Sequence, residues 1–187
     1  MTTALLILDM QNVFVPMTTT CLPHIKSLIS HFQSRSLPTI FLQHGHSKTE
    51  LTPPYKNQLV RKWGPADSIA TGSEDWKLMP DIAQFTEGHT IIAKNTYDGF
   101  INTDLANILK DLDVQTVVVC GVMTDCCCDT TARSAFNREY ETWLVKDACG
   151  TENESQHEAG LRGFGYGFGE VLESKEVMER VNRPFRG

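Results

Sequence analysis

Three consecutive cysteines, Cys126, Cys127 and Cys128, stand where an apolar run gives way to a helical pattern. The run at 117–119 consists of β-branched residues, which is typical of a buried strand, and Gly121 interrupts it. A thiol at this junction lies near the unpaired N–H groups and the positive end of a helix, which favour the thiolate. The same N–H groups can stabilise an oxyanion. The pattern therefore indicates a cysteine nucleophile.

The helical pattern separates one cysteine from the other two. Four residues form one apolar face of the predicted helix: Cys128, Ala132, Ala135 and Phe136. Cys128 therefore fits a small apolar residue in a helix–sheet contact, and Thr124 and Asp125 are expected to cap the helix. The residue pattern leaves Cys126 and Cys127 equal as candidate nucleophiles, against the alternative that all three thiols only fill space.

Two further ionisable residues end short apolar runs. Asp9 follows the run 4–8, and Lys94 ends the run 89–94. Parallel strands present their carboxyl ends at one edge of a sheet, where open α/β sheets bind ligands. We therefore expect Asp9 and Lys94 to meet the cysteines there, with a carboxylate suited to proton transfer and a cation that favours thiolate.

His44 and His46 follow a third run, 39–42. Two histidines at a strand end can bind a metal. No neighbouring acidic residue completes a ligand set, so a polar loop with hydrogen-bonded imidazoles is the favoured interpretation.

Strand and helix patterns alternate along the chain, which predicts a single α/β domain over 1–187. Its sheet is expected to be doubly wound and mostly parallel, in a Rossmann-like three-layer α/β/α arrangement. Further strands are expected at 142–145 and 170–172, and further helices at 22–32, 105–109, 153–161 and 173–181. The glycine-rich stretch 163–169 lacks the spacing of a phosphate-binding loop.

Composition limits the partners of the protein. The 187 residues carry a net charge of −6 with a pI near 5.5, which argues against nucleic acid or an anionic membrane as partner. No apolar run approaches the roughly 20 residues of a membrane span. The first nine residues lack the basic start and cleavage site of a signal peptide. The six cysteines show no disulfide or zinc spacing, so we expect reduced thiols in a cytoplasmic protein.

Residues 47–88 form a long irregular connection that contains Trp63 and Trp76. Long connections in compact domains tend to be functional or to contact a partner. The two tryptophans are expected to line a pocket, to pack a subunit contact or to anchor the connection to its own core.

Three separated motifs resemble the isochorismatase-like cysteine hydrolases along nearly the whole chain. The first is Asp-x-Gln-x-x-Phe at 9–14, and the second is Lys94 followed by Tyr97, Gly99, Phe100 and Thr103. The third is Gly-Val-x-Thr-x-x-Cys at 121–127, followed by Thr131 and Ala132.

The resemblance implies roles for named residues. Its register selects Cys127 as the nucleophile, with Asp9 and Lys94 completing a catalytic triad. It also implies a cis peptide between Val122 and Met123, and an oxyanion hole formed by the backbone N–H groups of Met123 and Cys127. Four aromatic residues are expected to contact the substrate: Phe14, Tyr97, Trp63 and Trp76.

The implied reaction is hydrolysis of a small amide, ureide or carbamoyl C–N bond through a covalent thioester, without a cofactor. Related proteins form dimers or tetramers, so a homo-oligomer is expected. The isochorismate hydrolases themselves carry glycine in place of Cys127. The nicotinamidase branch holds a metal with an aspartate whose place His44 takes, so we expect no metal. Two alternatives are vinyl-ether hydrolysis with Asp9 as the acid, and a non-catalytic thiol or redox protein.

Overall fold

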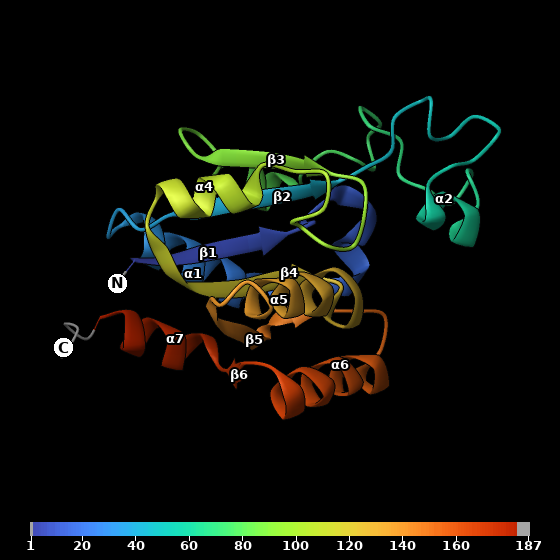
Figure 1. The fold of residues 1–187 in the computed structure, drawn as a ribbon. Helices are drawn as coiled ribbons and strands as arrows, with labels where there is room; N and C mark the ends of the chain where they lie inside the picture. The colour runs from blue at the N-terminus through green and yellow to red at the C-terminus, as the bar shows by residue number, and fades with distance from the viewer. Residues whose placement is uncertain (1, 183–187) are drawn as a thin grey trace.

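Six parallel strands form one sheet in the order β3-β2-β1-β4-β5-β6 (Figure 1). The computed structural model describes residues 2–182. The strands are β1 (Thr2–Leu8), β2 (Thr39–His44), β3 (Thr90–Lys94), β4 (Val114–Val122), β5 (Glu141–Gly150) and β6 (Glu170–Leu172). The chain builds outward from β1 to β3 and then returns to continue from β4 to β6 on the other side. This confirms the doubly wound α/β prediction and places the switch point between β1 and β4.

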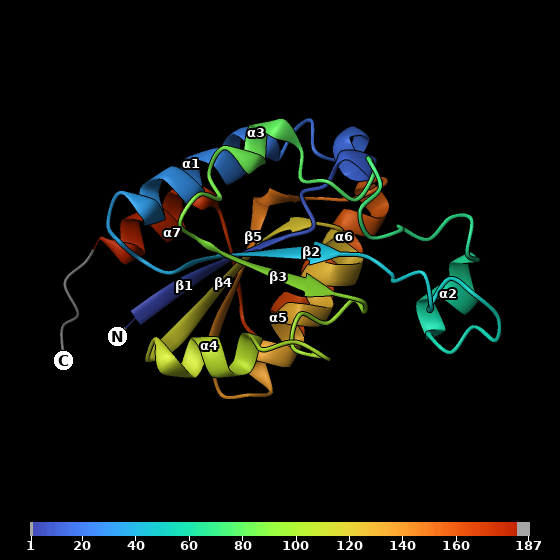
Figure 2. The ribbon, with the colours of Figure 1, turned by 90° about the horizontal axis from the view of Figure 1, so that it is seen from above.

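Helices cover both faces of the sheet (Figure 2). One face carries α1 (Leu22–Gln33), α3 (Pro80–Ala83) and α7 (Ser174–Val181). The other carries α4 (Leu105–Asp111), α5 (Asp129–Phe136) and α6 (Glu154–Gly167). This is the predicted three-layer arrangement.

The central strands are apolar on both faces because both faces are covered. Leu6 and Leu8 of β1 pack toward α4, α5 and α6, whereas Leu5 and Ile7 pack toward α1. All four side chains are at most 1% exposed, and burial of one such side chain contributes about 1.5–3 kcal/mol. Packing on both faces thus fixes the orientation of β1 and the position of Asp9 at its end.

Two elements are longer than the sequence pattern predicted. β5 does not end near residue 145 but continues to Gly150, and α6 extends through much of the glycine-rich stretch to Gly167. Glycine costs about 1 kcal/mol in a helix, but Gly163 and Gly165 allow close packing, since an added Cβ would meet Arg133 or Val171 at 3.0 and 3.2 Å. Tertiary packing therefore overrides the local preference.

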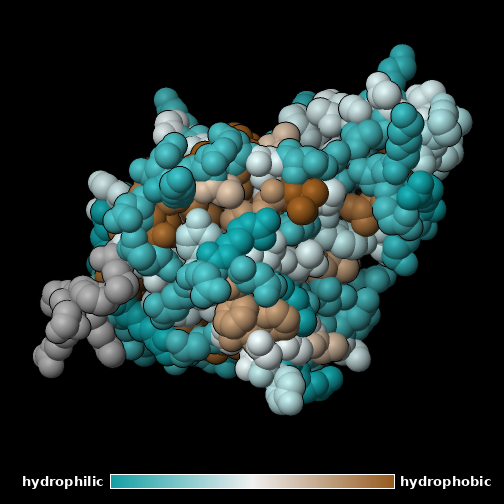
Figure 3. Space-filling view, viewed as in Figure 1, coloured by the Kyte–Doolittle hydropathy of each residue, from teal (hydrophilic) through white to brown (hydrophobic). Residues whose placement is uncertain are grey.

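The connection between β2 and β3 projects from the body of the molecule as an arm, residues 47–79, that includes α2 (Gln58–Trp63) (Figure 1). Its base is held by isolated bridges of His46 to Ala70 and of Gln11 to Leu78. The face in Figure 3 is largely hydrophilic, with apolar residues in small separate patches. Among residues 2–182, no helix combines the length and apolar character required to traverse a bilayer.

Candidate active site

Asp9 follows directly after β1 and lies at the switch point of the sheet. Its backbone has φ of 54°, a left-handed conformation that aspartate tolerates better than most residues. Its N–H donates to the carbonyl of Leu42 at 2.9 Å, and the residue is fully buried. The strand end thus holds a carboxylate inside the protein.

Lys94 is the last residue of β3 and directs its ammonium group toward Asp9. The Nζ atom lies 2.7 Å from Oδ2 of Asp9 and 3.4 Å from Sγ of Cys127, and it donates to the carbonyl of Thr96 at 3.0 Å. The side chains of Asp9 and Lys94 are both 0% exposed. Residues that are 33 and 85 positions apart from Lys94 therefore meet in one cluster, as the strand-end argument predicted.

Cys127 belongs to a single π-helical turn, η2 (Thr124–Cys128), between β4 and α5. The Val122–Met123 peptide that precedes this turn is cis, in agreement with the prediction. The carbonyl of Met123 accepts the N–H groups of both Cys126 and Cys128 at 3.1 Å, which anchors the turn on either side of Cys127. The Cys127 side chain is buried against Lys94.

The expected side-chain caps of this turn have other partners. Oγ1 of Thr124 lies 2.9 Å from Nδ1 of His157, and Oδ1 of Asp125 accepts from the hydroxyl of Thr151 at 2.6 Å. Neither side chain caps the helix, so that part of the prediction is wrong. The contacts instead tie the Cys127 turn to α6 and the segment before it, which no sequence pattern indicates.

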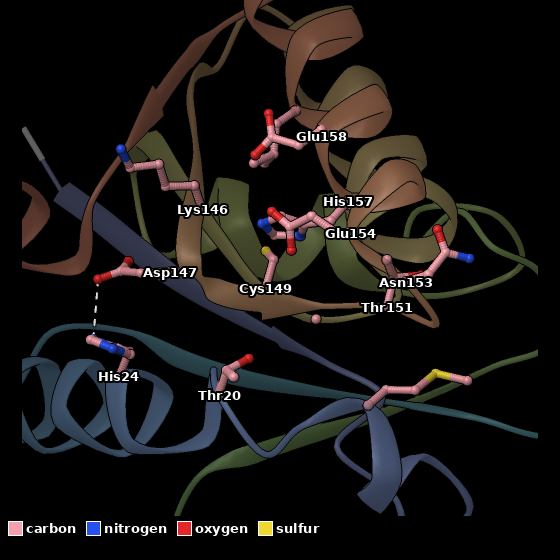
Figure 4. Close-up of a pocket in the computed structure, with 13 residues that line it drawn as sticks. Thr20, His24, Lys146, Asp147, Cys149, Thr151, Asn153, Glu154, His157 and Glu158 are labelled. Carbon is pink, nitrogen blue, oxygen red and sulfur yellow. Dashed lines mark ion pairs between the residues drawn. The ribbon is translucent and has the colours of Figure 1, made fainter.

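A cavity of about 370 Å³ lies beside these contacts (Figure 4). Thr151 and His157 line it, and an ion pair between His24 and Asp147, 3.1 Å apart, crosses its rim. Thr151 and His157 therefore line this cavity and at the same time hold the Cys127 turn.

The charges of the cluster depend on one another. Burial raises the pKa of the Asp9 carboxyl, and the charge of Lys94 opposes that rise in part. Burial acts to lower the pKa of Lys94, but the charges of Asp9 and Cys127 and the hydrogen bonds to them outweigh it, so the pKa is raised. Lys94 therefore stays cationic, and its charge favours the ionised form of Asp9.

The thiol of Cys127 differs from the expected thiolate. Burial raises its pKa far above the ordinary value of a thiol; Lys94 lowers it in part, and Asp9 raises it further. Desolvation thus opposes the effect of the helix terminus and favours the protonated thiol. A neighbouring base is needed to remove the proton.

Cys126 differs from Cys127 in its surroundings. It is half-buried, and burial together with Asp125 raises its pKa to about 11. It does not line the cavity that Cys127 faces. Geometry thus separates two thiols that the residue pattern left equal. All six cysteines are free thiols.

Cys127 opens onto a cavity of about 250 Å³. Its lining residues are Val13, Phe14, Met17, His44, His46, Leu59, Trp63, Asp67, Ser68, Ile69, Tyr97, Met123, Cys127 and Glu152. The predicted contact residues Phe14, Tyr97 and Trp63 are among them, and Nε1 of Trp63 donates to the hydroxyl of Tyr97 at 2.9 Å. The cavity therefore has aromatic walls and the thiol at its base.

Trp76, also expected to contact substrate, is not among these lining residues. Its carbonyl accepts from the side chains of Gln11 at 2.7 Å and of Gln43 at 2.9 Å, so Trp76 anchors the arm. The buried Gln11 side chain also accepts from the N–H of His44 at 2.9 Å and donates to its carbonyl at 2.8 Å. Gln11 positions the end of β2, and only its place in the Asp-x-Gln motif signals this role.

The residues around His44 do not fit the metal of the nicotinamidase branch. Within 2–182, no group of three or more His, Cys, Asp or Glu side chains is placed to hold a metal. Glu50, whose Oε1 lies 3.7 Å from Nδ1 of His46, already accepts hydrogen bonds from Ser47, Asn57 and Asn95. The described residues around His44 therefore do not supply the ligand set of that metal.

Comparison with known proteins places this geometry in a family. The Isochorismatase domain matches residues 3–176. Nicotinamidase 3 of Arabidopsis thaliana is 34% identical over 179 residues, which cover 95% of this chain and 88% of that protein. A ureidoacrylate amidohydrolase of Pantoea ananatis is 26% identical over 84% of this chain and 70% of its own.

A solved structure agrees with the sequence relatives. The cysteine hydrolase of Pseudomonas syringae pv. phaseolicola superposes with a TM-score of 0.86 at 27% identity and covers 96% of this chain and 92% of that one. The domain match spans β1 to α7 and includes the Asp9, Lys94 and Cys127 cluster. The chain therefore belongs to the isochorismatase family of hydrolases.

Proposed function

We propose that this protein is a cysteine-dependent amidohydrolase that cleaves a small amide, ureide or carbamoyl C–N bond through a covalent thioester. The observation that carries the proposal is the buried contact of Lys94 with both Asp9 and Cys127, at the base of an aromatic-walled cavity. Amide hydrolysis needs a nucleophile, a group that transfers protons and a means of stabilising an oxyanion. The cluster offers one residue for each of the first two.

In the acylation step, Asp9 accepts the thiol proton of Cys127 while Sγ forms a bond to the substrate carbonyl carbon. The raised pKa of Asp9 makes its carboxylate a stronger base than an exposed one. The backbone N–H groups of Met123 and Cys127 stabilise the oxyanion, and one such donor contributes about 10²–10³ in rate. Asp9 then returns the proton to the nitrogen as the C–N bond breaks.

In the deacylation step, water replaces the departed amine. Asp9 accepts a proton from this water while the water oxygen attacks the thioester carbon. The C–S bond then breaks, the carboxylic acid leaves and the proton returns to Cys127. Lys94 remains cationic throughout and limits the build-up of negative charge in the buried cluster.

The activities for which the relatives are named support a C–N bond as the target. Both the nicotinamidase and the ureidoacrylate amidohydrolase are named for amide hydrolysis. The vinyl-ether alternative uses Asp9 alone and leaves no role for the thiol that Lys94 contacts. The non-catalytic alternative leaves the buried Asp9–Lys94 pair without a function.

The test is ammonia release from a panel of small carboxamides, ureides and carbamoyl compounds. We expect turnover with wild type, loss of turnover with Cys127→Ala, and a mass increase on the Cys127 peptide equal to the acyl group after acid quench. Cys126→Ala is the matched control, since it removes the adjacent thiol outside the cavity. Full turnover in Cys127→Ala would instead support chemistry by Asp9 alone.

A further inference from the structure

Two buried histidines occupy the wall of the active-site cavity, and the reaction above does not use them. His44 is 8% exposed and His46 is 1% exposed, and both line the cavity. Their rings lie 4.9 Å apart, nearly perpendicular. Neither Nδ1 atom has a hydrogen-bond partner among the described residues. The closest anion to Nδ1 of His46 is Oε1 of Glu50 at 3.7 Å, beyond hydrogen-bond range.

Both imidazoles are neutral at physiological pH. Burial, followed by the charge of Lys94, lowers the pKa of His44 to about 3. Burial also lowers the pKa of His46, although Glu50 opposes the shift. A neutral imidazole carries one lone-pair nitrogen, and Nδ1 of His44 is buried without a hydrogen-bond partner among the described residues. Nδ1 of His44 can therefore accept a hydrogen bond from an N–H group of the ligand.

The charged residues of the cavity wall are acidic. Asp67 and Glu152 line its mouth, both exposed, and none of the lining residues that the structure describes is lysine or arginine. Lys94, behind the thiol, is already paired with Asp9 and Thr96. A substrate carboxylate would thus find no cation among the lining residues and would face two carboxylates; the exposed Lys62 lies outside the lining, over the Trp63 ring at 5.0 Å from its centroid.

From this arrangement we infer that the cavity selects uncharged amides that donate an N–H to His44, and that it rejects amides bearing a carboxylate. This inference rests on the proposed amide hydrolysis and specifies its substrate class.

Two pairs of probes differ in charge but hardly in shape: terephthalamide with its monoacid, and succinamide with succinamate. Binding is measured by calorimetry in the Cys127→Ala protein, so that a result is obtained with or without turnover. We expect each diamide to bind about tenfold or more tightly than its monoacid at low salt, and the gap to narrow as salt screens the carboxylates.

Variants at the wall test the two parts of the inference. His44→Leu should weaken binding of the diamides about tenfold, whereas His44→Asn, which keeps an acceptor near Nδ1, should retain most of the affinity. Asp67→Lys, an exposed substitution at the mouth, should improve binding of the monoacids relative to the diamides.

Equal or tighter binding of the monoacids, or no binding of either pair, would overturn the inference. A preference for diamides in Cys127→Ala without ammonia release by the wild-type enzyme from any amide would leave the inference standing and refute the proposed reaction. The two failures are therefore distinguishable.

Discussion

At the scale of single residues, the chemistry depends on how one buried cation is shared. Lys94 contacts both a carboxylate and a thiol in surroundings where burial disfavours either anion. One negative charge beside Lys94 is well compensated and a second is not, so Asp9 and Cys127 compete for it. In the proposed reaction this competition favours a protonated Cys127 while Asp9 is ionised, and proton transfer to Asp9 as the thiol attacks.

Asp9→Asn separates nucleophile ionisation from catalysis. Asparagine accepts the left-handed backbone of Asp9, but it cannot accept a proton, so amide hydrolysis should fall about 10²–10⁴-fold. Asp9 raises the pKa of Cys127, so its removal should lower that pKa and increase the thiolate fraction at pH 7. We therefore expect faster iodoacetamide labelling of Cys127 in a less active enzyme. If the pH dependence of Cys127 labelling were the same in Asp9→Asn and in wild type, Asp9 and Cys127 would not compete for the charge of Lys94.

Lys94→Met should have the opposite effect on the thiol. Loss of the cation removes the charge that lowers the Cys127 pKa, so labelling should become slower and require higher pH. Cys126, with a pKa raised to about 11 by burial, serves as the internal reference on the same peptide map. If labelling of Cys127 did not shift, Lys94 would act only as the structural partner of Asp9.

At the scale of elements, the hydrophobic period predicts the strands, and the residues at the strand ends predict which side chains meet. The runs ending at Asp9 and Lys94 and the break at Gly121 gave the strands and the convergence of the cluster. Two features depend on distant partners and so leave no local signal. One is the π-helical turn held through Thr124 by His157, and the other is the cavity wall contributed by residues of the arm such as Asp67. Phe136 also departs from its predicted inward face and is 40% exposed at the end of α5.

Gly121 tests how tightly the elements fix the site. Its φ is 118°, and a Cβ there would lie 2.2 Å from the carbonyl oxygen of Leu8, the residue before Asp9. Gly121→Ala should therefore push β4 away from β1 and destabilise the fold by about 3 kcal/mol or more. Gly167→Ala in α6 is the control, since its Cβ would meet nothing within 4 Å and alanine favours a helix. Chemical denaturation of both variants measures the difference, and equal stabilities would show that β1 and β4 can separate without cost.

At the scale of the whole molecule, the arm between β2 and β3 forms part of the wall of the active-site cavity. It supplies Leu59, Trp63 and Asp67 to the wall, and it projects from the body while backbone hydrogen bonds tie its base to the segment after β1 and to His46 (Figure 1). The Trp63 side chain is 51% exposed. Ordering a long irregular segment costs conformational entropy, and burial of its exposed aromatic surface would add stabilisation. A covering surface from a second copy would supply that stabilisation.

We propose that the protein is a closed homo-oligomer that associates through the β3 end of the sheet. β3 is an edge strand with Ile91 46% exposed, and it lies on the same side as the arm. Light scattering at micromolar concentration should give a mass of at least twice the 21.0 kDa of one chain. Ile91→Lys should shift the protein toward monomer because a charge on an edge strand opposes pairing. Tyr166→Ser is the matched control: it removes a side chain that is 95% exposed on α6 and should leave the mass unchanged. A single-chain mass for wild type would exclude the association. Dissociation by Tyr166→Ser alone would place the interface elsewhere.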